Sequence, residues 1–230
     1  MDTFSRRQFI TGVGISSVGV FLGGCASKGG SKEVTAVEDL MREHGVLRRA
    51  LFLYSETAIR LRSNPSSVPP DALHKAAKLF RAFGEDYHEK KLEEAYIFPA
   101  VKKAGGEAAR YPEILVEQHQ RGREITDYIL ALSREAILDA NAELLALALE
   151  SLVRMYRPHA AREDTIVFPA WKQALTAKQL DEMNDKFEEI EHQQFGEQGF
   201  EDAVRQISDI EGELGLADLA QFTAPHPLSK

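Results

Sequence analysis

Two stretches of the sequence repeat one pattern of residue types that bind metal ions. Residues 87–100 and 158–170 each contain, in order, a histidine, an acidic doublet and Phe-Pro-Ala. In the second copy His159 and Glu163 lie four residues apart, so a helix presents the imidazole and the carboxylate on one face, about one turn apart. This spacing suits a metal ion held by both side chains, and two copies predict two metal ions.

The first copy is one residue longer than the second. His88 and Glu93 lie five residues apart, and five residues of a regular α-helix rotate by about 500°, which would turn the two side chains away from each other. A π-bulge would absorb the extra residue, and such bulges are frequent at functional sites. We therefore predict a π-bulge between His88 and Glu93.

Two further histidines lie on apolar stripes with helical spacing. His44 falls among apolar residues that recur every three or four positions from residue 37 to residue 61, and His119 falls on a similar stripe from residue 115 to residue 129. A lone histidine on such a stripe is usually a core residue with a hydrogen-bond partner. Four histidines and two carboxylates on facing stripes are different, because burying them without partners would cost several kcal/mol. A metal centre removes this cost.

The elements that must position these residues are long helices. Helical periodicity predicts an all-α, up-down four-helix bundle over residues 35–174, and the histidines divide it into two similar halves. Thr176 and Gln179 form a predicted capping box that begins a C-terminal helical extension over residues 175–215. Residues 216–230 are expected to be a flexible tail.

We interpret the first residues as an export signal and not as part of the folded domain. Residues 5–10, Ser-Arg-Arg-Gln-Phe-Ile, resemble a twin-arginine export motif, and the following apolar run is too short to span a bilayer as a mature helix. Residues 22–25, Leu-Gly-Gly-Cys, resemble a lipoprotein box. We therefore expect a signal peptide at 1–24, a lipidated Cys25 and a tether at 25–34. The protein would be exported and anchored in a membrane, facing the periplasm or the cell surface.

The charge of the chain argues against nucleic-acid binding, and its cysteine content argues against an internal disulfide. The full chain has a net charge of −8, and loss of the predicted signal peptide would make it −9. A nucleic-acid-binding protein needs clustered lysine and arginine, so the chain is a poor candidate for this class and we expect no nucleic-acid partner. Cys25 is the only cysteine, so the chain forms no internal disulfide.

The chain resembles the hemerythrin-like, HHE cation-binding family over about residues 36–172. The resemblance rests on the Arg-Glu-His that ends at His44, the Glu-Gln-His that ends at His119, and the two blocks that lead from His88 and His159 to Phe-Pro. It implies a bundle of hemerythrin type with a non-haem di-iron site bridged by an oxo or hydroxo group. The implied terminal ligands are His44, His88, His119 and His159, and the implied bridging carboxylates are Glu93 and Glu163. Nitrogen and carboxylate donors favour iron over manganese or zinc.

One position departs from the oxygen-carrying hemerythrins. They have a second histidine one turn after the third-helix ligand, and here that position is Arg123, which cannot bind iron. The resemblance implies binding of a small ligand such as dioxygen, nitric oxide or peroxide, for sensing, carriage or iron handling. Without that histidine, one more coordination position on the irons is open, which leaves an oxidase or peroxide-consuming enzyme as an alternative. A structural bundle without a functional metal is a third possibility. Tyr54, Tyr87 and Tyr156 lie near the ligand layers, with core packing as the default and a supporting hydrogen bond as the alternative.

A ferritin-like di-iron bundle is a competing interpretation of the same sequence. Glu85 with His88 and Glu189 with His192 both fit its Glu-x-x-His signature. This alternative leaves His119, His159 and the repeated Phe-Pro unexplained, and His192 lies off the packing stripe of its helix. We expect His192 at the surface or in a supporting position.

Overall fold

The computed structural model describes residues 34–134 and 138–227. The predicted signal peptide, Cys25 and residues 25–33 of the tether lie outside the described residues. Among the helices that the structure describes, none combines the length and the apolar character needed to cross a membrane.

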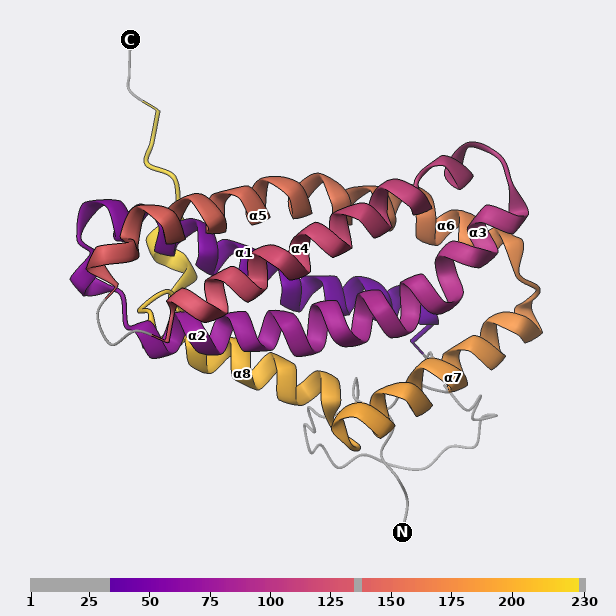
Figure 1. The fold of residues 1–230 in the computed structure, drawn as a ribbon. Helices are drawn as coiled ribbons and strands as arrows, with labels where there is room; N and C mark the ends of the chain where they lie inside the picture. The colour runs from indigo at the N-terminus through magenta and orange to yellow at the C-terminus, as the bar shows by residue number, and fades with distance from the viewer. Residues whose placement is uncertain (1–33, 135–137, 228–230) are drawn as a thin grey trace, which may run out of the picture.

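Four long helical rods form the body of the molecule (Figure 1). The first is α1 (Ala36–Ser63), and the third is α4 (Pro112–Leu132). The second rod joins α2 (Pro70–Leu79), a π-helical segment (Phe80–Ile97) and α3 (Phe98–Ala104), and the fourth joins α5 (Ala142–Arg162), a π-helical turn (Glu163–Val167) and α6 (Phe168–Ala174). Successive rods run in opposite directions, and the described residues contain no strand. The predicted all-α four-helix bundle is confirmed.

The sequence encodes the ends of the rods locally. The Thr35 side chain accepts a hydrogen bond from the Glu38 amide, and the Glu38 side chain accepts one from the Thr35 amide, so a capping box begins α1. Gly105 and Gly106 end α3 with φ angles of 77° and 75°, a backbone region that favours glycine. These caps set where each histidine falls along the bundle.

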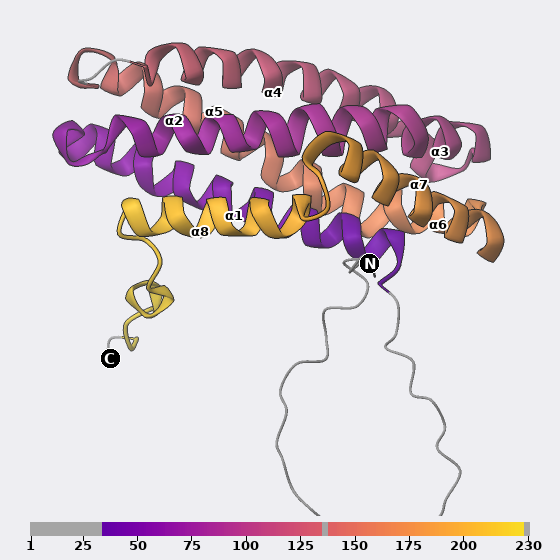
Figure 2. The same cartoon turned by 90° about the horizontal axis from the view of Figure 1, so that it is seen from below.

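Two C-terminal helices cover one side of the bundle (Figure 2). α7 (Ala177–Phe195) begins at the predicted Thr176–Gln179 capping box, and α8 (Gly199–Glu213) lies along α1 and α2. In α7, Phe187 stacks on Trp171 with ring centroids 5.6 Å apart. A short 3-10 helix (Leu219–Phe222) follows, and its Phe222 ring packs edge-on against Phe52 of α1. The rods are joined by short 3-10 helices at Pro65–Ser67, Glu107–Arg110 and Asp139–Asn141.

Candidate metal centre

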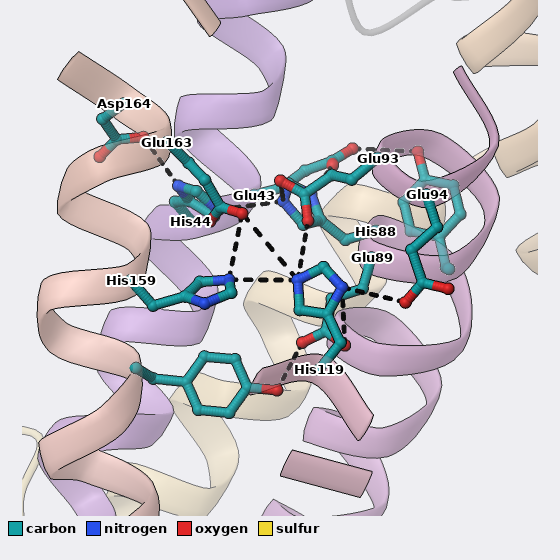
Figure 3. A network of polar contacts seen from close by, with 12 residues as sticks. Glu43, His44, His88, Glu89, Glu93, Glu94, His119, His159, Glu163 and Asp164 are labelled. Carbon is teal, nitrogen blue, oxygen red and sulfur yellow. Dashed lines mark hydrogen bonds and ion pairs between the residues drawn. The ribbon is translucent and has the colours of Figure 1, made fainter. Parts of the chain in front are cut away.

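The structure brings all six predicted ligand residues to one buried layer between the four rods (Figure 3). Each of the four rods contributes one histidine, and the second and fourth rods also contribute one glutamate each. None of the six side chains is more than 4% exposed, so all six lie in the interior of the bundle. They are His44, His88, Glu93, His119, His159 and Glu163.

The π-helical segment explains how His88 and Glu93 reach the same place. A π-helix closes its hydrogen bonds between residues five apart, so residues at that spacing lie on one face. The segment is 18 residues long and includes both side chains, which confirms the predicted bulge and extends it. The sequence did not indicate the second π-helical segment, which begins at Glu163 in the other copy of the repeat.

The histidines form two pairs through their Nε2 atoms. His44 Nε2 and His88 Nε2 lie 3.0 Å apart, and His119 Nε2 and His159 Nε2 lie 3.1 Å apart. Each pair therefore presents two inward-facing nitrogen atoms. The two pairs define two neighbouring subsites of the candidate centre.

Each glutamate faces both subsites with different oxygen atoms. Glu93 Oε1 is 3.4 Å from His88 Nε2, and Glu93 Oε2 is 3.4 Å from His119 Nε2. Glu163 Oε2 is 3.6 Å from His44 Nε2, and Glu163 Oε1 is 3.1 Å from His159 Nε2. Two close groups of metal-binding side chains result, and Glu93 belongs to both. This is the arrangement expected of carboxylates that bridge two metal ions.

The carboxylate oxygens of the centre lack hydrogen-bond donors, which fits the presence of a pair of cations. The four carboxylate oxygens of Glu93 and Glu163 are buried and accept no hydrogen bond of acceptable geometry from the described residues. A buried carboxylate that accepts no well-formed hydrogen bond is costly, and a coordinated metal ion removes that cost. The donor set of imidazole nitrogens and carboxylate oxygens suits iron and other first-row transition metals.

A ring of four polar side chains orients the imidazoles from outside. Each histidine donates its Nδ1 hydrogen to an oxygen on a neighbouring rod, which leaves Nε2 facing the centre. The pairs are His44 with Asp164 (2.7 Å), His88 with Glu43 (2.6 Å), His119 with Glu94 (3.0 Å) and His159 with Gln118 (2.8 Å). We call Glu43, Glu94, Gln118 and Asp164 the support ring. Sequence reasoning missed their roles, although each is the immediate neighbour of a predicted ligand.

Burial and neighbouring charge separate the pKa values of the first histidine pair. Burial, together with the neighbouring His88, lowers the pKa of His44 to about 3. Burial also opposes the charged form of His88, but the Glu93 and Glu43 carboxylates outweigh it and raise the pKa of His88 to about 10. In the absence of a metal ion, His88 therefore holds a proton that must leave when a metal ion binds.

Arg123, which replaces the second histidine of the third helix, is turned toward carboxylates. Its guanidinium bonds to Glu94 and lies 3.5 Å from Glu89 Oε2. Glu89 is buried, accepts a hydrogen bond of 2.5 Å from the Tyr156 hydroxyl, and lies 3.9 Å from His119 Nδ1. Glu89, Glu94 and His119 form a third close group of metal-binding side chains. Apart from its position next to His88, no feature of the sequence indicated the role of Glu89.

The three tyrosines near the ligand layers have different roles. Tyr87 and Tyr156 donate hydrogen bonds to Glu43 and Glu89, so both support the centre as well as packing in the core. The buried Tyr54 hydroxyl makes no hydrogen bond within the described part of the chain.

The residues of the ferritin-like alternative do not gather at this layer. Glu85 is buried away from the ligands and bonds to Arg81 (2.8 Å) and Thr126 (2.6 Å). Glu189 is exposed and bonds to Lys186, and His192 is half-buried in the last turn of α7. Of the close metal-binding groups among residues 34–134 and 138–227, none contains Glu85, Glu189 or His192.

Comparison with known proteins agrees with this geometry. The model of the hemerythrin HHE cation-binding domain matches residues 35–171. Two similar proteins, both described as uncharacterized, come from Mycobacterium tuberculosis and Mycobacterium bovis. Each is 46% identical over 192 residues, which cover 83% of this chain and 74% of the relative. No solved structure matches the chain significantly. The chain belongs to the hemerythrin HHE cation-binding domain family.

Proposed function

We propose that the protein holds two non-haem iron ions and binds dioxygen, nitric oxide or a related small ligand at them. The observation that carries the proposal is the orientation of Glu93 and Glu163. Each turns one oxygen toward each histidine pair, and none of these oxygens accepts a hydrogen bond from the described residues. Iron at this site would supply reversible ligand binding and electron transfer, and manganese or zinc suits the proposal less well.

The chain itself orients the ligands and keeps water away. The support ring fixes the imidazoles with Nε2 inward, which is how outer partners commonly tune a metal ligand. The repeated Phe-Pro motif has a related purpose, because Phe98 stacks on the His119 ring at 5.5 Å and Phe168 packs against the His44 ring at 5.3 Å. Both phenylalanines are buried, so they shield the centre from the end formed by α3 and α6.

Consumption of peroxide is the second candidate function, and two observations favour it. Arg123 points to carboxylates and not to the ligand pairs, so the position of the missing histidine provides no protein ligand. The Tyr156 hydroxyl bonds to Glu89, and its ring lies 5.2 Å from the His159 ring, which places an oxidisable side chain beside the centre.

One spectroscopic experiment separates the two candidates. The reduced, iron-loaded protein is mixed with dioxygen or nitric oxide and then with peroxide, and its ultraviolet-visible spectrum is followed. A new absorption band that disappears when the gas is removed supports ligand binding. Repeated loss of added peroxide, with the oxidised protein returning after each addition, supports the enzyme. A protein that loads iron but gives neither response contradicts both candidates.

The proposal also includes an export route and an anchor. The twin-arginine motif at residues 5–10 is typical of proteins that fold before they cross the membrane, and metal binding is coupled to folding. Loading iron in the cytoplasm would therefore fix the metal before the protein meets another compartment. If a general-secretory signal replaces residues 1–24 and the exported protein still carries the same metal in the same amount, the route has no bearing on metal identity.

A further inference from the structure

Two cavities between α1 and α5 lie one behind the other from the surface to the candidate metal centre. The inner cavity is small, with a volume of about 10 Å³, and is lined by every predicted ligand except His119. The outer cavity encloses about 510 Å³, including its open mouth, and Phe52 and Arg157 line its outer part. Four residues line both cavities, namely Arg48, Leu51, Tyr156 and Ala160. The two spaces are therefore adjacent along a single path.

The path has apolar side chains along its walls and charged side chains at its mouth. Leu51 and Ala160 are buried apolar side chains that line both cavities. Arg48 from α1 and Arg157 from α5 are exposed and bring two guanidinium groups to the mouth. The residues that line the outer cavity include these two arginines and no carboxylate, and Arg48 is paired with Asp164, so the mouth keeps an excess of positive charge on a chain of net charge −8. Cationic side chains at the entrance of an apolar passage raise the association rate of anions.

Arg48 lies where the outer cavity meets the inner one. Its guanidinium bonds to Asp164 Oδ2, while Asp164 Oδ1 accepts the hydrogen bond from His44 Nδ1. The Arg48 side chain is 47% exposed, and an ion pair with so exposed a partner contributes little stability. The guanidinium is therefore free to leave Asp164 at low cost. Within the described residues, the Arg157 guanidinium donates one hydrogen bond, to Ser55 Oγ at 3.0 Å.

We propose that small monovalent anions reach the metal centre through this passage between α1 and α5. Arg48 and Arg157 draw the anion to the mouth, and Arg48 moves off Asp164 to admit it. Because the inner cavity is small, the anions concerned are the smallest ones, such as azide, nitrite and hydroperoxide. This inference rests on the proposed function, because the passage matters only if small ligands bind at the centre.

Rates of ligand association test the passage. Azide, as an anionic probe, and nitric oxide, as a neutral probe, are mixed rapidly with the iron-loaded protein at several salt concentrations. The variants are Arg48→Gln, Arg157→Gln and the double variant. Arg62→Gln is the matched control, because Arg62 is also on α1 and pairs with Glu143 and Glu150 away from the passage. Iron content is measured for each protein.

The double variant is expected to bind azide about tenfold more slowly at low salt and to show a weaker dependence on salt. Nitric oxide should associate within about twofold of the wild-type rate, and Arg62→Gln should match the wild type with both probes. Leu51→Trp, which narrows the passage, should slow both probes. Wild-type azide rates in the double variant, or equal slowing of azide and nitric oxide in it, would overturn the inference. If nitric oxide binds to the iron-loaded wild-type protein and azide does not, the passage for anions is wrong and the proposed function stands. If neither probe binds, the proposed function fails together with the passage.

Discussion

Glu43 accepts a hydrogen bond of 2.6 Å from His88 Nδ1, although its own neighbour in the sequence is His44, a predicted ligand on the same rod. The same crossed relationship holds around the bundle. Each member of the support ring follows or precedes one ligand in the sequence and supports the ligand of the next rod. The ring therefore couples the orientation of each imidazole to the placement of the adjacent rod.

We predict that breaking this ring weakens metal binding without removing a ligand. Glu43→Gln and Asp164→Asn replace charged acceptors of the His88 and His44 hydrogen bonds with neutral amides of similar shape. Each should lower the affinity for iron by about tenfold, as changes to outer partners of metal ligands commonly do. Competition with a chelator of known affinity measures the effect.

Glu150→Gln is the control for these two variants, because Glu150 is an exposed residue of α5 that pairs with Arg62. It should keep wild-type affinity for iron. If Glu43→Gln and Asp164→Asn also keep wild-type affinity, the ring does not orient the ligands.

In the metal-free protein, the combined contribution of His44 and His88 to stability should be greatest near pH 6.5. The folded pKa of His88 is about 10, above its ordinary value of 6.5, so its contribution is full below pH 6.5 and is lost as the pH rises toward 10. The folded pKa of His44 is about 3, so its contribution is full above pH 6.5 and is lost as the pH falls toward 3. The loss on the alkaline side amounts to at most about 5 kcal/mol, because one pKa unit corresponds to about 1.4 kcal/mol.

Urea unfolding of the metal-free protein at several pH values measures this dependence. Glu93→Gln removes the carboxylate that raises the pKa of His88 most, so this variant should lose less stability between pH 6.5 and 10. Equal alkaline losses in the wild type and the variant would show that the proton on His88 does not depend on Glu93.

Gly122 makes room for the tyrosine beside the centre. A Cβ at Gly122 would lie 2.2 Å from the Tyr156 hydroxyl oxygen, so Gly122→Ala must displace the side chain that bonds to Glu89. We expect a loss of about 2 kcal/mol in the free energy of unfolding. Gly45→Ala is the control, because a Cβ added at position 45 would have no neighbouring atom within 4 Å and because alanine favours a helix more than glycine does.

A double variant tests whether the hydroxyl is the cause. Combined with Tyr156→Phe, Gly122→Ala should cost about 1 kcal/mol less than it does alone, because the nearest clashing atom is gone. Strict additivity of the two changes would assign the loss at Gly122 to another contact.

Much of this architecture was predictable from the sequence because its signals are local. The apolar stripes fix which side of each helix is buried, and they include His44 and His119. The single extra residue between His88 and Glu93 is enough to predict a π-bulge, since it has a definite angular consequence. The capping box at Thr176 likewise depends only on residues three apart.

The crossed contacts were not predictable in the same way. Which rod Glu43 or Asp164 supports depends on how the rods are rotated against each other, and a single sequence does not record that rotation. Glu89 and Tyr156 are 67 positions apart, and each has an ordinary core or surface role when its own helix is considered alone. The second π-helical segment lacks an inserted residue between His159 and Glu163, so no change in spacing revealed it.

The membrane anchor is tested at Cys25. Cys25→Ser removes the thiol that would carry lipid, so the protein should move from the membrane fraction to the soluble fraction, because attachment depends on the lipid chains. Ser27→Ala, a change in the same predicted tether, should leave the distribution as in the wild type. An unchanged membrane fraction for Cys25→Ser would contradict the lipoprotein interpretation.

The iron content of the purified mature protein tests the central claim most directly. Elemental analysis after expression in iron-rich medium should give about two iron ions per chain, because two histidine pairs share two bridging carboxylates. Glu163→Ala should reduce this content substantially, whereas Glu189→Ala, in the ferritin-like signature, should retain it. A wild-type content below about a tenth of an iron per chain, or loss of iron in Glu189→Ala but not in Glu163→Ala, would contradict the assignment of the centre.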